Sequence, residues 1–395
     1  MLAPLDSATR TRRIVAELLG VSVASALVVT AYRIDRQWIS RHVTLLNGPP
    51  FTDETWTSAA RASLVLLAVL VVLGLRPALV SIASKGTLAG LTRWTVPVLL
   101  AIAASAVTVE AFLRWKQPKA LRGEWAYPPY SAPHPRYGWT GPPSSTTTVR
   151  VSGRDTLLAF NRGGIRVRNP DDEPDPALPT ILFTGESSAL GFGLDYAETY
   201  PALIAERRGV QCVNLAAPAY GSDQAYLRLI DAMPRFERLV ATVTVFIPLQ
   251  LGRNLHDDRP RLALGPTGEL DFVPPATGFL SRLRIRKLFW NGLPYLGDRA
   301  IDRTLTLTSA ILRETSIRTR ARGATPLFVI PVHGPNRPLD QHAEAWVVRA
   351  LFVQHEIPFI LVDIPPDQLL NGDFHPGPRG DETIAAAILA ALPPR

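Results

Sequence analysis

The chain has 395 residues, enough for more than one folded unit. Its formal net charge of +8 would ordinarily suggest nucleic acid or an anionic membrane as a partner. Residues 1–123 hold 14 Lys and Arg against 6 Asp and Glu, whereas residues 124–395 hold 28 of each. The positive excess therefore flanks the apolar N-terminal segments. Because the downstream part is neutral overall, we do not expect a protein that binds nucleic acid.

Three apolar spans lie in residues 1–123, at about 14–32, 62–83 and 94–113. Each is close to the ~20 residues that cross a bilayer as a helix, which predicts a membrane region with three transmembrane helices. The alternatives are core helices of a soluble bundle or, for the first span alone, a signal peptide, although no convincing small-residue cleavage site follows it. Glu17 and Glu110 lie near span ends, and we interpret them as carboxylates tolerated at the interface.

Arginine and lysine near the spans indicate the orientation of the chain in the membrane. Arg10, Arg12 and Arg13 precede the first span, and Lys85 and Arg93 lie between the second and third. These clusters favour a cytoplasmic N-terminus, so that three crossings place everything after the third span outside. The basic residues that follow the first and third spans oppose this assignment.

Residues 124–178 form a linker and lead-in. Six prolines between residues 126 and 143 predict an extended, semi-rigid spacer that holds the downstream domain off the membrane. Residues 144–160, rich in Thr, Val and Ser, predict one or two strands. Trp139 could be a platform for a sugar, but packing against the domain is the interpretation we favour.

Residues 179–395 alternate between apolar runs and helical patterns. Strands are expected at 180–184, 210–215, 239–247, 327–332 and 357–363, and helices at 199–208, 222–233, 301–322, 341–355 and 380–392. Continuous apolar strands separated by helices predict an α/β domain whose five-stranded parallel sheet is covered by helices on both faces. Residues 248–297 interrupt the pattern as an insertion that could cover a substrate, or be a plain surface excursion.

Three further features have alternative interpretations. The only cysteine, Cys212, lies in an apolar run and is expected to be a buried structural thiol. His333 ends a predicted strand and could line a site or be an ordinary loop histidine. His256, Asp257 and Asp258 could be imagined as metal ligands, but no second cluster supports them, so we interpret them as a solvated loop and expect no metal and no cofactor.

The stretch from Thr180 to Ala202 carries the candidate nucleophile. Ser187 and Ser188 follow a buried strand in a turn punctuated by glycines, the place where open α/β sheets position reactive groups. Near the C-terminus, Asp373 and His375 stand two residues apart in a loop before the last helix. Together they could supply the nucleophile, the general base and the carboxylate that orients the base.

Gly185-Glu186-Ser187 resembles the first block of the SGNH (GDSL-type) hydrolases, with Glu where Asp is usual. Asp373-Phe374-His375, followed by Gly380, resembles the last block, although the usual spacing there is Asp-x-x-His. The resemblance spans roughly residues 137–392 and implies an SGNH-like (flavodoxin-like) fold. It also favours Ser187 over Ser188 as the nucleophile, because Ser187 occupies the serine position of the block.

The resemblance also implies where an oxyanion hole would lie. The family's donors are the amide of the nucleophile, a glycine in the second block and an asparagine in the third. In this chain the glycine position falls on Ala219, with Gly221 two residues later. The asparagine position falls on Arg253, or on Asn254 with a shift of one residue, and we favour Asn254 because a neutral amide is the usual donor.

Three functions remain open on the sequence. The first is a membrane-anchored serine esterase that deacylates a carbohydrate or a related ester. The second is an O-acyltransferase that moves the acyl group onto an extracellular polysaccharide and would need a membrane partner as the acyl donor. The third is a catalytically silent binding domain, since several blocks depart from the family pattern.

Overall fold

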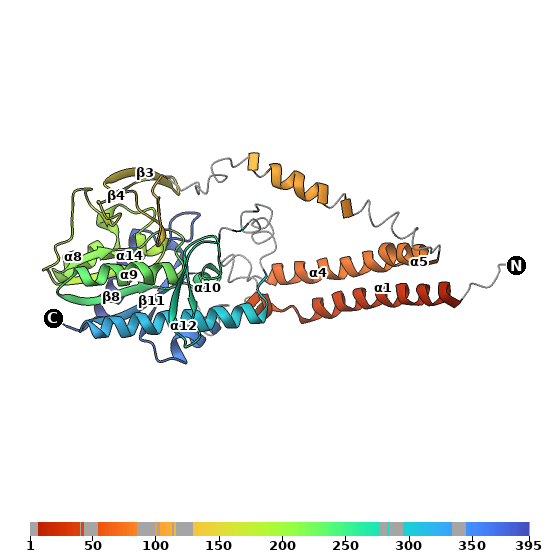
Figure 1. Cartoon of the computed structure of the whole chain (residues 1–395). Coiled ribbons are helices and arrows are strands. Elements are labelled where there is room, and N and C mark those ends of the chain that lie inside the picture. The colour runs from red at the N-terminus through yellow and green to blue at the C-terminus, as the bar shows by residue number, and fades with distance from the viewer. Residues whose placement is uncertain are drawn as a thin grey trace. The chain divides into compact units, whose positions relative to one another are not determined.

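The computed structural model describes residues 7–39, 41–42, 54–84, 99–100, 103–112, 114–115, 129–276, 278, 283, 295–333 and 345–394. The chain divides into two compact units (Figure 1). The first comprises residues 1–118 with the short stretch 283–295, and the second comprises residues 119–282 and 296–395.

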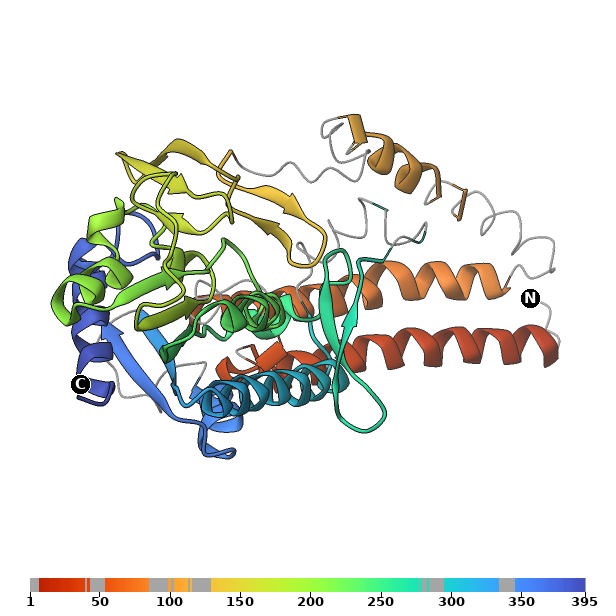
Figure 2. The same ribbon diagram turned by 60° about the vertical axis from the view of Figure 1, so that its left-hand side comes forward.

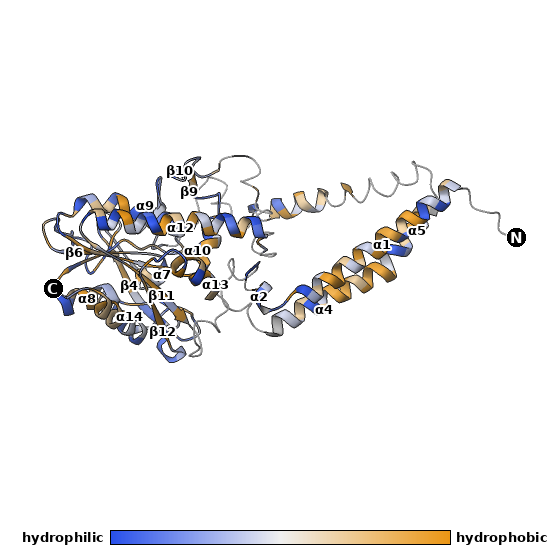
Figure 3. Cartoon of the chain, turned by 90° about the horizontal axis from the view of Figure 1, so that it is seen from below, coloured by the Kyte–Doolittle hydropathy of each residue, from blue (hydrophilic) through white to orange (hydrophobic). Residues whose placement is uncertain are grey.

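The first unit is a helical hairpin. Its helices are α1 (Ser7–Arg33), α2 (Arg36–Ile39), α4 (Glu54–Leu70), the π-helical turn η3 (Val71–Leu75) and α5 (Arg76–Ser84). α1 packs along both α4 and α5. Small residues of α1, such as Ala24, face this contact and pack on Ala68 and Val71, while large side chains such as Leu18, Leu66 and Leu73 are exposed. The hairpin therefore has a small-residue seam and an apolar outer surface, coloured orange in Figure 3.

An ion pair joins the two arms of the hairpin. The carboxylate of Glu17 accepts a hydrogen bond from Nε of Arg76, which lies 59 residues further on. Gly20 makes room for this crossing, because a Cβ there would lie 2.9 Å from Cβ of Arg76. Glu17 is therefore a paired residue, which its position near a span end did not indicate. Glu110 pairs with Arg114 one helical turn away, at 2.6 Å.

Within the part of the chain that the structure describes, two helices are long and apolar enough, by length and composition, to cross a membrane: Ser7–Arg33 and Thr57–Ala83. They correspond to the first two expected spans. The third expected span, 94–113, lies only partly within the described residues, which form a shorter apolar helix over Ala103–Phe112. Lys85 and Arg93, on which the expected orientation depends, lie outside the described residues.

The second unit is built on an eight-stranded sheet in the order β12-β11-β8-β6-β7-β5-β4-β3. The first five of these are parallel. Their bounds are β6 Thr180–Thr184, β7 Gln211–Asn214, β8 Leu239–Val245, β11 Thr325–His333 and β12 Phe359–Ile364. All five strands lie within two residues of the ranges expected from the sequence, and β6 and β8, in the middle of the parallel part, are almost entirely buried.

Helices cover both faces of this sheet. Figure 3 shows α9 and α12 on one side and α8 and α14 on the other. Their bounds are α8 Tyr200–Arg208, α9 Ser222–Ala232, α12 Asp298–Ala321 and α14 Pro378–Ala391. The shorter helical elements are α7 Ser187–Leu190, η5 Tyr196–Glu198, η6 Met233–Arg235, α10 Leu249–Arg253, α13 Ala345–Val348, η9 Arg349–Val353 and η10 Pro366–Gln368. The architecture is the expected α/β fold with a mostly parallel central sheet.

The lead-in contains strands in the expected range 144–160, but their place in the sheet differs from expectation. β3 (Ser145–Val151), β4 (Arg154–Phe160) and β5 (Arg166–Val167) are antiparallel and extend the main sheet beyond β7, so the sheet has eight strands rather than five. The described part of the expected spacer contains a small hairpin, β1 (Ala132–His134) with β2 (Gly138–Thr140). These residues belong to the second unit. Figure 2 shows this yellow region, and the teal hairpin of β9 (Arg261–Leu264) and β10 (Leu270–Val273) that forms within the insertion.

Candidate active site

The turn after β6 presents Ser187 at the carboxyl end of the sheet. Gly185 has a φ of 148°, and a Cβ there would lie 2.9 Å from Cβ of Ala189, so the turn requires glycine. Glu186 caps the short helix α7 by accepting a hydrogen bond from the backbone N–H of Ser188 at 3.1 Å. Ser187 is partly exposed, whereas Ser188 is buried. The turn therefore offers the first serine, and not the second, to a ligand.

His375 reaches Ser187 from a loop 188 residues away in sequence. Its Nε2 lies 2.8 Å from Oγ of Ser187, and its Nδ1 lies 2.6 Å from Oδ1 of Asp373. The same Oδ1 accepts the backbone N–H of His375 at 3.0 Å. Oδ1 of Asp373 therefore contacts both the backbone and the ring of His375. Because the tight turn directs the carboxylate toward the ring, a spacing of two residues is enough to pair Asp373 with His375. The structure brings together the three residues that the sequence suggested.

Asp373 is held in its ionised form. Burial alone would raise the pKa of its carboxyl, but hydrogen bonds from the backbone N–H and the ring of His375, with a smaller contribution from Phe374, lower it overall. An ionised carboxylate on Nδ1 fixes the proton there and leaves Nε2 as the acceptor that faces Ser187.

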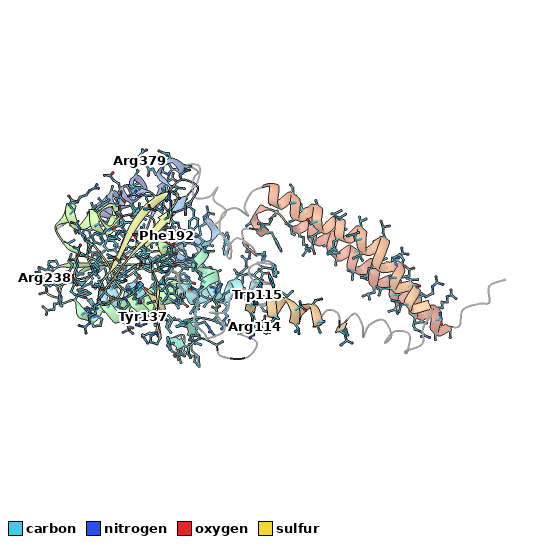
Figure 4. The ribbon with its side chains drawn as sticks, turned by 90° about the horizontal axis from the view of Figure 1, so that it is seen from above. Arg114, Trp115, Tyr137, Phe192, Arg238 and Arg379 are labelled. Atoms are coloured by element: carbon cyan, nitrogen blue, oxygen red, sulfur yellow. The ribbon has the colours of Figure 1, made fainter. Side chains whose placement is uncertain are left out.

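Two aromatic rings flank the imidazole. Phe374 stacks on His375 with ring centroids 4.3 Å apart, and 51% of its surface is exposed. Phe192, labelled in Figure 4, lies 5.2 Å from the ring of His375 and packs against Val149 and Val151 of β3. Neither ring is predicted as a site residue from the sequence, where the single available signal is the position of Phe374 between Asp373 and His375.

The side chain of Glu186 is a second acceptor at the nucleophile. Its Oε2 lies 2.6 Å from Oγ of Ser187, and the residue is fully buried. A hydroxyl has one proton, so Ser187 can donate to His375 or to Glu186 but not to both. Arg253 provides a compensating charge: burial lowers the pKa of its guanidinium, and the Glu186 carboxylate opposes that shift.

Ala219 lies on a loop that runs beside the nucleophile turn. This loop follows β7, and its Ala217 donates a backbone hydrogen bond to the carbonyl of Gly185 at 3.4 Å. Ala219 adopts a φ of 59°, the left-handed region that favours glycine. Among the described residues, the backbone N–H groups of Ser187 and Ala219 have no hydrogen-bond acceptor. Gly221, by contrast, donates its N–H to Oε1 of Gln224 at 3.2 Å. Of the two candidate backbone donors in this loop, only that of Ala219 remains open to a ligand.

The third-block position requires a correction. Asn254, which we favoured as the donor, is 1% exposed, and its Nδ2 donates to Oγ of Ser222 at 2.7 Å and to Oγ1 of Thr308 at 2.8 Å. Both amide hydrogens are thus used to join α9 to α12. Arg253 precedes Asn254 at the end of α10, and its guanidinium donates a hydrogen bond to the carbonyl of Tyr220 at 3.1 Å. The guanidinium also interacts electrostatically with the carboxylate of Glu186. Of the two residues, Arg253 is therefore the better candidate for this position, and its role stays a prediction.

The remaining candidates lie apart from this site. Cys212 packs against the main core, where burial raises the pKa of its thiol. His333 ends β11 and pairs with Ile364 of β12. Within the described ranges, no group of three or more His, Cys, Asp and Glu side chains could hold a metal ion.

Comparison with known proteins gives structural neighbours only. No family model matches the chain, and no curated protein matches it. An acetyl xylan esterase from the rumen bacterium Butyrivibrio proteoclasticus is 12% identical, with a TM-score of 0.32 over 56% of this chain and 64% of that one. A carbohydrate esterase family 2 enzyme of Corynascus thermopiles is 15% identical, with a TM-score of 0.31 over 56% and 69%. A lipolytic protein assigned to the G-D-S-L family, from Desulfitobacterium hafniense, is 9% identical, with a TM-score of 0.28 over 53% and 98%.

The chain therefore spans about two thirds of the length of the first two neighbours and nearly all of the third. At these TM-scores the chemical interpretation rests on the geometry of the site itself.

Proposed function

We propose that this chain is a membrane-anchored serine esterase of the SGNH type, in which Ser187 forms an acyl-enzyme with the help of His375 and Asp373. The observation that carries the proposal is the continuous chain of contacts from Asp373 to His375 to Ser187, at 2.6 and 2.8 Å, assembled from the two ends of the domain. Chance packing seldom places an imidazole between a carboxylate and a serine hydroxyl at the end of a parallel sheet.

The proposed reaction has two halves. Oγ of Ser187 attacks the ester carbonyl while its proton passes to Nε2 of His375. The carbonyl oxygen becomes an oxyanion that the N–H groups of Ser187 and Ala219 and the guanidinium of Arg253 stabilise. The tetrahedral intermediate collapses, the C–O bond of the ester breaks, and the alcohol leaves with the proton from His375. Water then attacks the acyl-enzyme by the same route and releases the acid and Ser187.

The proton position at Ser187 decides whether attack can begin. When the hydroxyl donates to Glu186, its lone pair faces His375, which must then be the donor. When it donates to a neutral His375, the triad is ready. The competent state therefore has an unprotonated Nε2, which accepts the proton of Ser187 during the attack.

Labelling with a fluorophosphonate probe tests the nucleophile. The native protein should be labelled and Ser187→Ala should not, while Ser188→Ala, the matched control in the same turn, should keep its label. Hydrolysis of an acetylated sugar and of an aryl acetate should follow the same pattern. Label that persists in Ser187→Ala would assign the reactive serine elsewhere, and a native protein that is neither labelled nor active would favour a silent domain.

His375→Gln should cost as much turnover as Ser187→Ala, because nucleophile and base act as a unit. Asp373→Asn should cost about 10⁴-fold, less than either, since the ring keeps its contact with Ser187. The measurement is kcat for an aryl acetate. A His375→Gln protein with a native rate would refute the triad. Adding sugar acceptors to the native assay asks whether the acyl group can pass to a hydroxyl instead of water.

For the first unit we propose a membrane anchor. Its support is the hairpin of two apolar helices, with small residues along the inner contact and large apolar side chains outside. Three crossings would put the catalytic unit on the opposite side from a cytoplasmic N-terminus, whereas two would put both on one side. Protease added to intact cells that carry an N-terminal tag distinguishes the two, because only an odd number of crossings exposes the domain while it protects the tag.

A further inference from the structure

Three consecutive carbonyl groups of the loop after β7 are each held by a different side chain. The carbonyl of Pro218 accepts Nε1 of Trp139 at 2.7 Å, that of Ala219 accepts Nη1 of Arg259 at 2.8 Å, and that of Tyr220 accepts Nη1 of Arg253 at 3.1 Å. Surface loops rarely have every carbonyl tied in this way, since water can satisfy them. The loop is therefore fixed in orientation as well as in position.

The hydrogen bond from Trp139 orients the Pro218–Ala219 peptide group, which carries the candidate oxyanion donor. The carbonyl of Pro218 and the N–H of Ala219 belong to one planar, trans peptide unit, in which they point in opposite directions. A hydrogen bond that fixes the carbonyl on one side therefore aims the N–H to the other. That N–H is the open donor of the loop, beside the turn that carries Ser187.

The loop also needs such a restraint. Ala219 stands in the left-handed region at a φ of 59°, which costs an alanine about 1–2 kcal/mol. Strained backbone of this kind persists only where surrounding contacts determine it. Arg259 contributes on the other side of the same residue and is itself buried, with its guanidinium 5.6 Å from the ring centroid of Trp139.

The loop after β7 in turn restrains Trp139 through contacts with Tyr220. Its ring lies 5.6 Å from that of Tyr220, and its backbone carbonyl accepts the Tyr220 hydroxyl. The neighbouring Tyr137, labelled in Figure 4, ties the same hairpin to α9 by donating from its hydroxyl to Oδ2 of Asp231 at 2.6 Å. The β1–β2 hairpin thus reaches α9 through Tyr137 and the loop through Trp139.

We propose that Trp139 is a positioning residue for the oxyanion site: its indole N–H orients the Pro218–Ala219 peptide so that the Ala219 N–H points at the developing oxyanion of the ester. This rests on the proposed function, because it names a device within that same site. The role differs from a sugar platform, since it uses the indole N–H and not the ring face.

Trp139→Phe removes the N–H and keeps an aromatic ring. We expect kcat for an aryl acetate to fall at least about 10-fold, up to the 10²–10³ typical of a lost oxyanion donor, with KM nearly unchanged. The affinity for phenylboronic acid, whose serine adduct mimics the tetrahedral intermediate, should weaken in parallel. Tyr137→Phe is the matched control, because it removes a hydrogen bond from the same hairpin without touching the Pro218 carbonyl. It should leave both quantities within about twofold.

Urea unfolding of both variants separates positioning from folding, because rates are compared only where each protein is fully folded. A native kcat in Trp139→Phe, a loss that appears in KM alone, an unchanged boronate affinity, or an equal loss in Tyr137→Phe would each overturn the proposal. These outcomes differ from failure of the proposed function, in which the native protein itself neither turns over the ester nor labels at Ser187. That failure would remove the basis of this proposal too.

Discussion

Replacing Asn254 and Arg253 separately tests the corrected register of the third block. Asn254→Ala removes three buried hydrogen bonds: those that Nδ2 donates to Ser222 and Thr308, and the longer one, at 3.4 Å, that Oδ1 accepts from the backbone N–H of Asp223. Each contributes about 1 kcal/mol net, and two buried hydroxyls are left with fewer partners, so unfolding should become easier by about 2–4 kcal/mol. That is a large share of the ~5–15 kcal/mol stability of a domain, yet it leaves most molecules folded. The rate per folded molecule should stay within about threefold of native.

Arg253→Met should behave in the opposite way. It retains the aliphatic length but removes the cation that faces Glu186 and the carbonyl of Tyr220, so kcat should fall about 10²-fold or more, with a smaller change in stability. The assay pairs urea midpoints with kcat for an aryl acetate in conditions where each variant is folded. A hundredfold loss of kcat in Asn254→Ala with an unchanged urea midpoint would refute the reasoning and restore Asn254 as the donor.

Three other predictions follow from the described contacts. Ala219→Gly should relieve the left-handed strain at φ 59° and keep the N–H, so the urea midpoint should rise or hold while kcat stays near native; a large loss of kcat would show that the methyl group matters. Burial raises the pKa of Asp223 to about 6, although the charge of Arg259 opposes this shift. The folded state therefore binds the proton of this carboxyl more tightly than the unfolded chain does. The free energy of unfolding should fall, by at most about 3 kcal/mol, as pH rises from about 4 to about 6. Unfolding of Asp223→Asn across that range should lack this slope, and equal slopes would contradict the assignment. Gly20→Leu should push α1 and α5 apart, because a Cβ at residue 20 would lie 2.9 Å from Cβ of Arg76. Crosslinking between cysteines introduced into α1 and α5 should then be weaker than in the control variant Ala24→Ser. Crosslinking at the native level would contradict the close approach of the two helices.

The parallel core of the second unit could be predicted because its signals are local. Each buried strand is one continuous apolar run, and each covering helix has its own periodicity, so β6, β7 and β8 fall where the sequence placed them. The candidate nucleophile and base were also accessible, since they directly follow a strand and directly precede the last helix.

Features that depend on contacts far apart in sequence were not predicted. Glu17 and Arg76 are 59 residues apart, and nothing in either segment specifies the other. The choice between Arg253 and Asn254 depends on the directions in which their side chains point at the end of the short helix α10. The spacing of residues in the sequence does not specify these directions. The prolines around Trp139 predict a spacer, but the structure has a hairpin there, because proline is compatible with short edge strands.

In the proposed membrane-anchored esterase, the position of the β1–β2 hairpin determines what a proteolytic cut would release. A protease that cuts before residue 129 would shed the catalytic unit with Trp139 in place. A cut between β2 and β3, at residues 141–144, would break the covalent link between Trp139 and the part of the chain that carries Ser187, so that Trp139 would be held by non-covalent contacts such as its hydrogen bond to the carbonyl of Pro218. The first scission would release a working soluble enzyme, and the second would release one with a loosened oxyanion loop. The site of cleavage would then determine whether the released domain keeps or loses its activity.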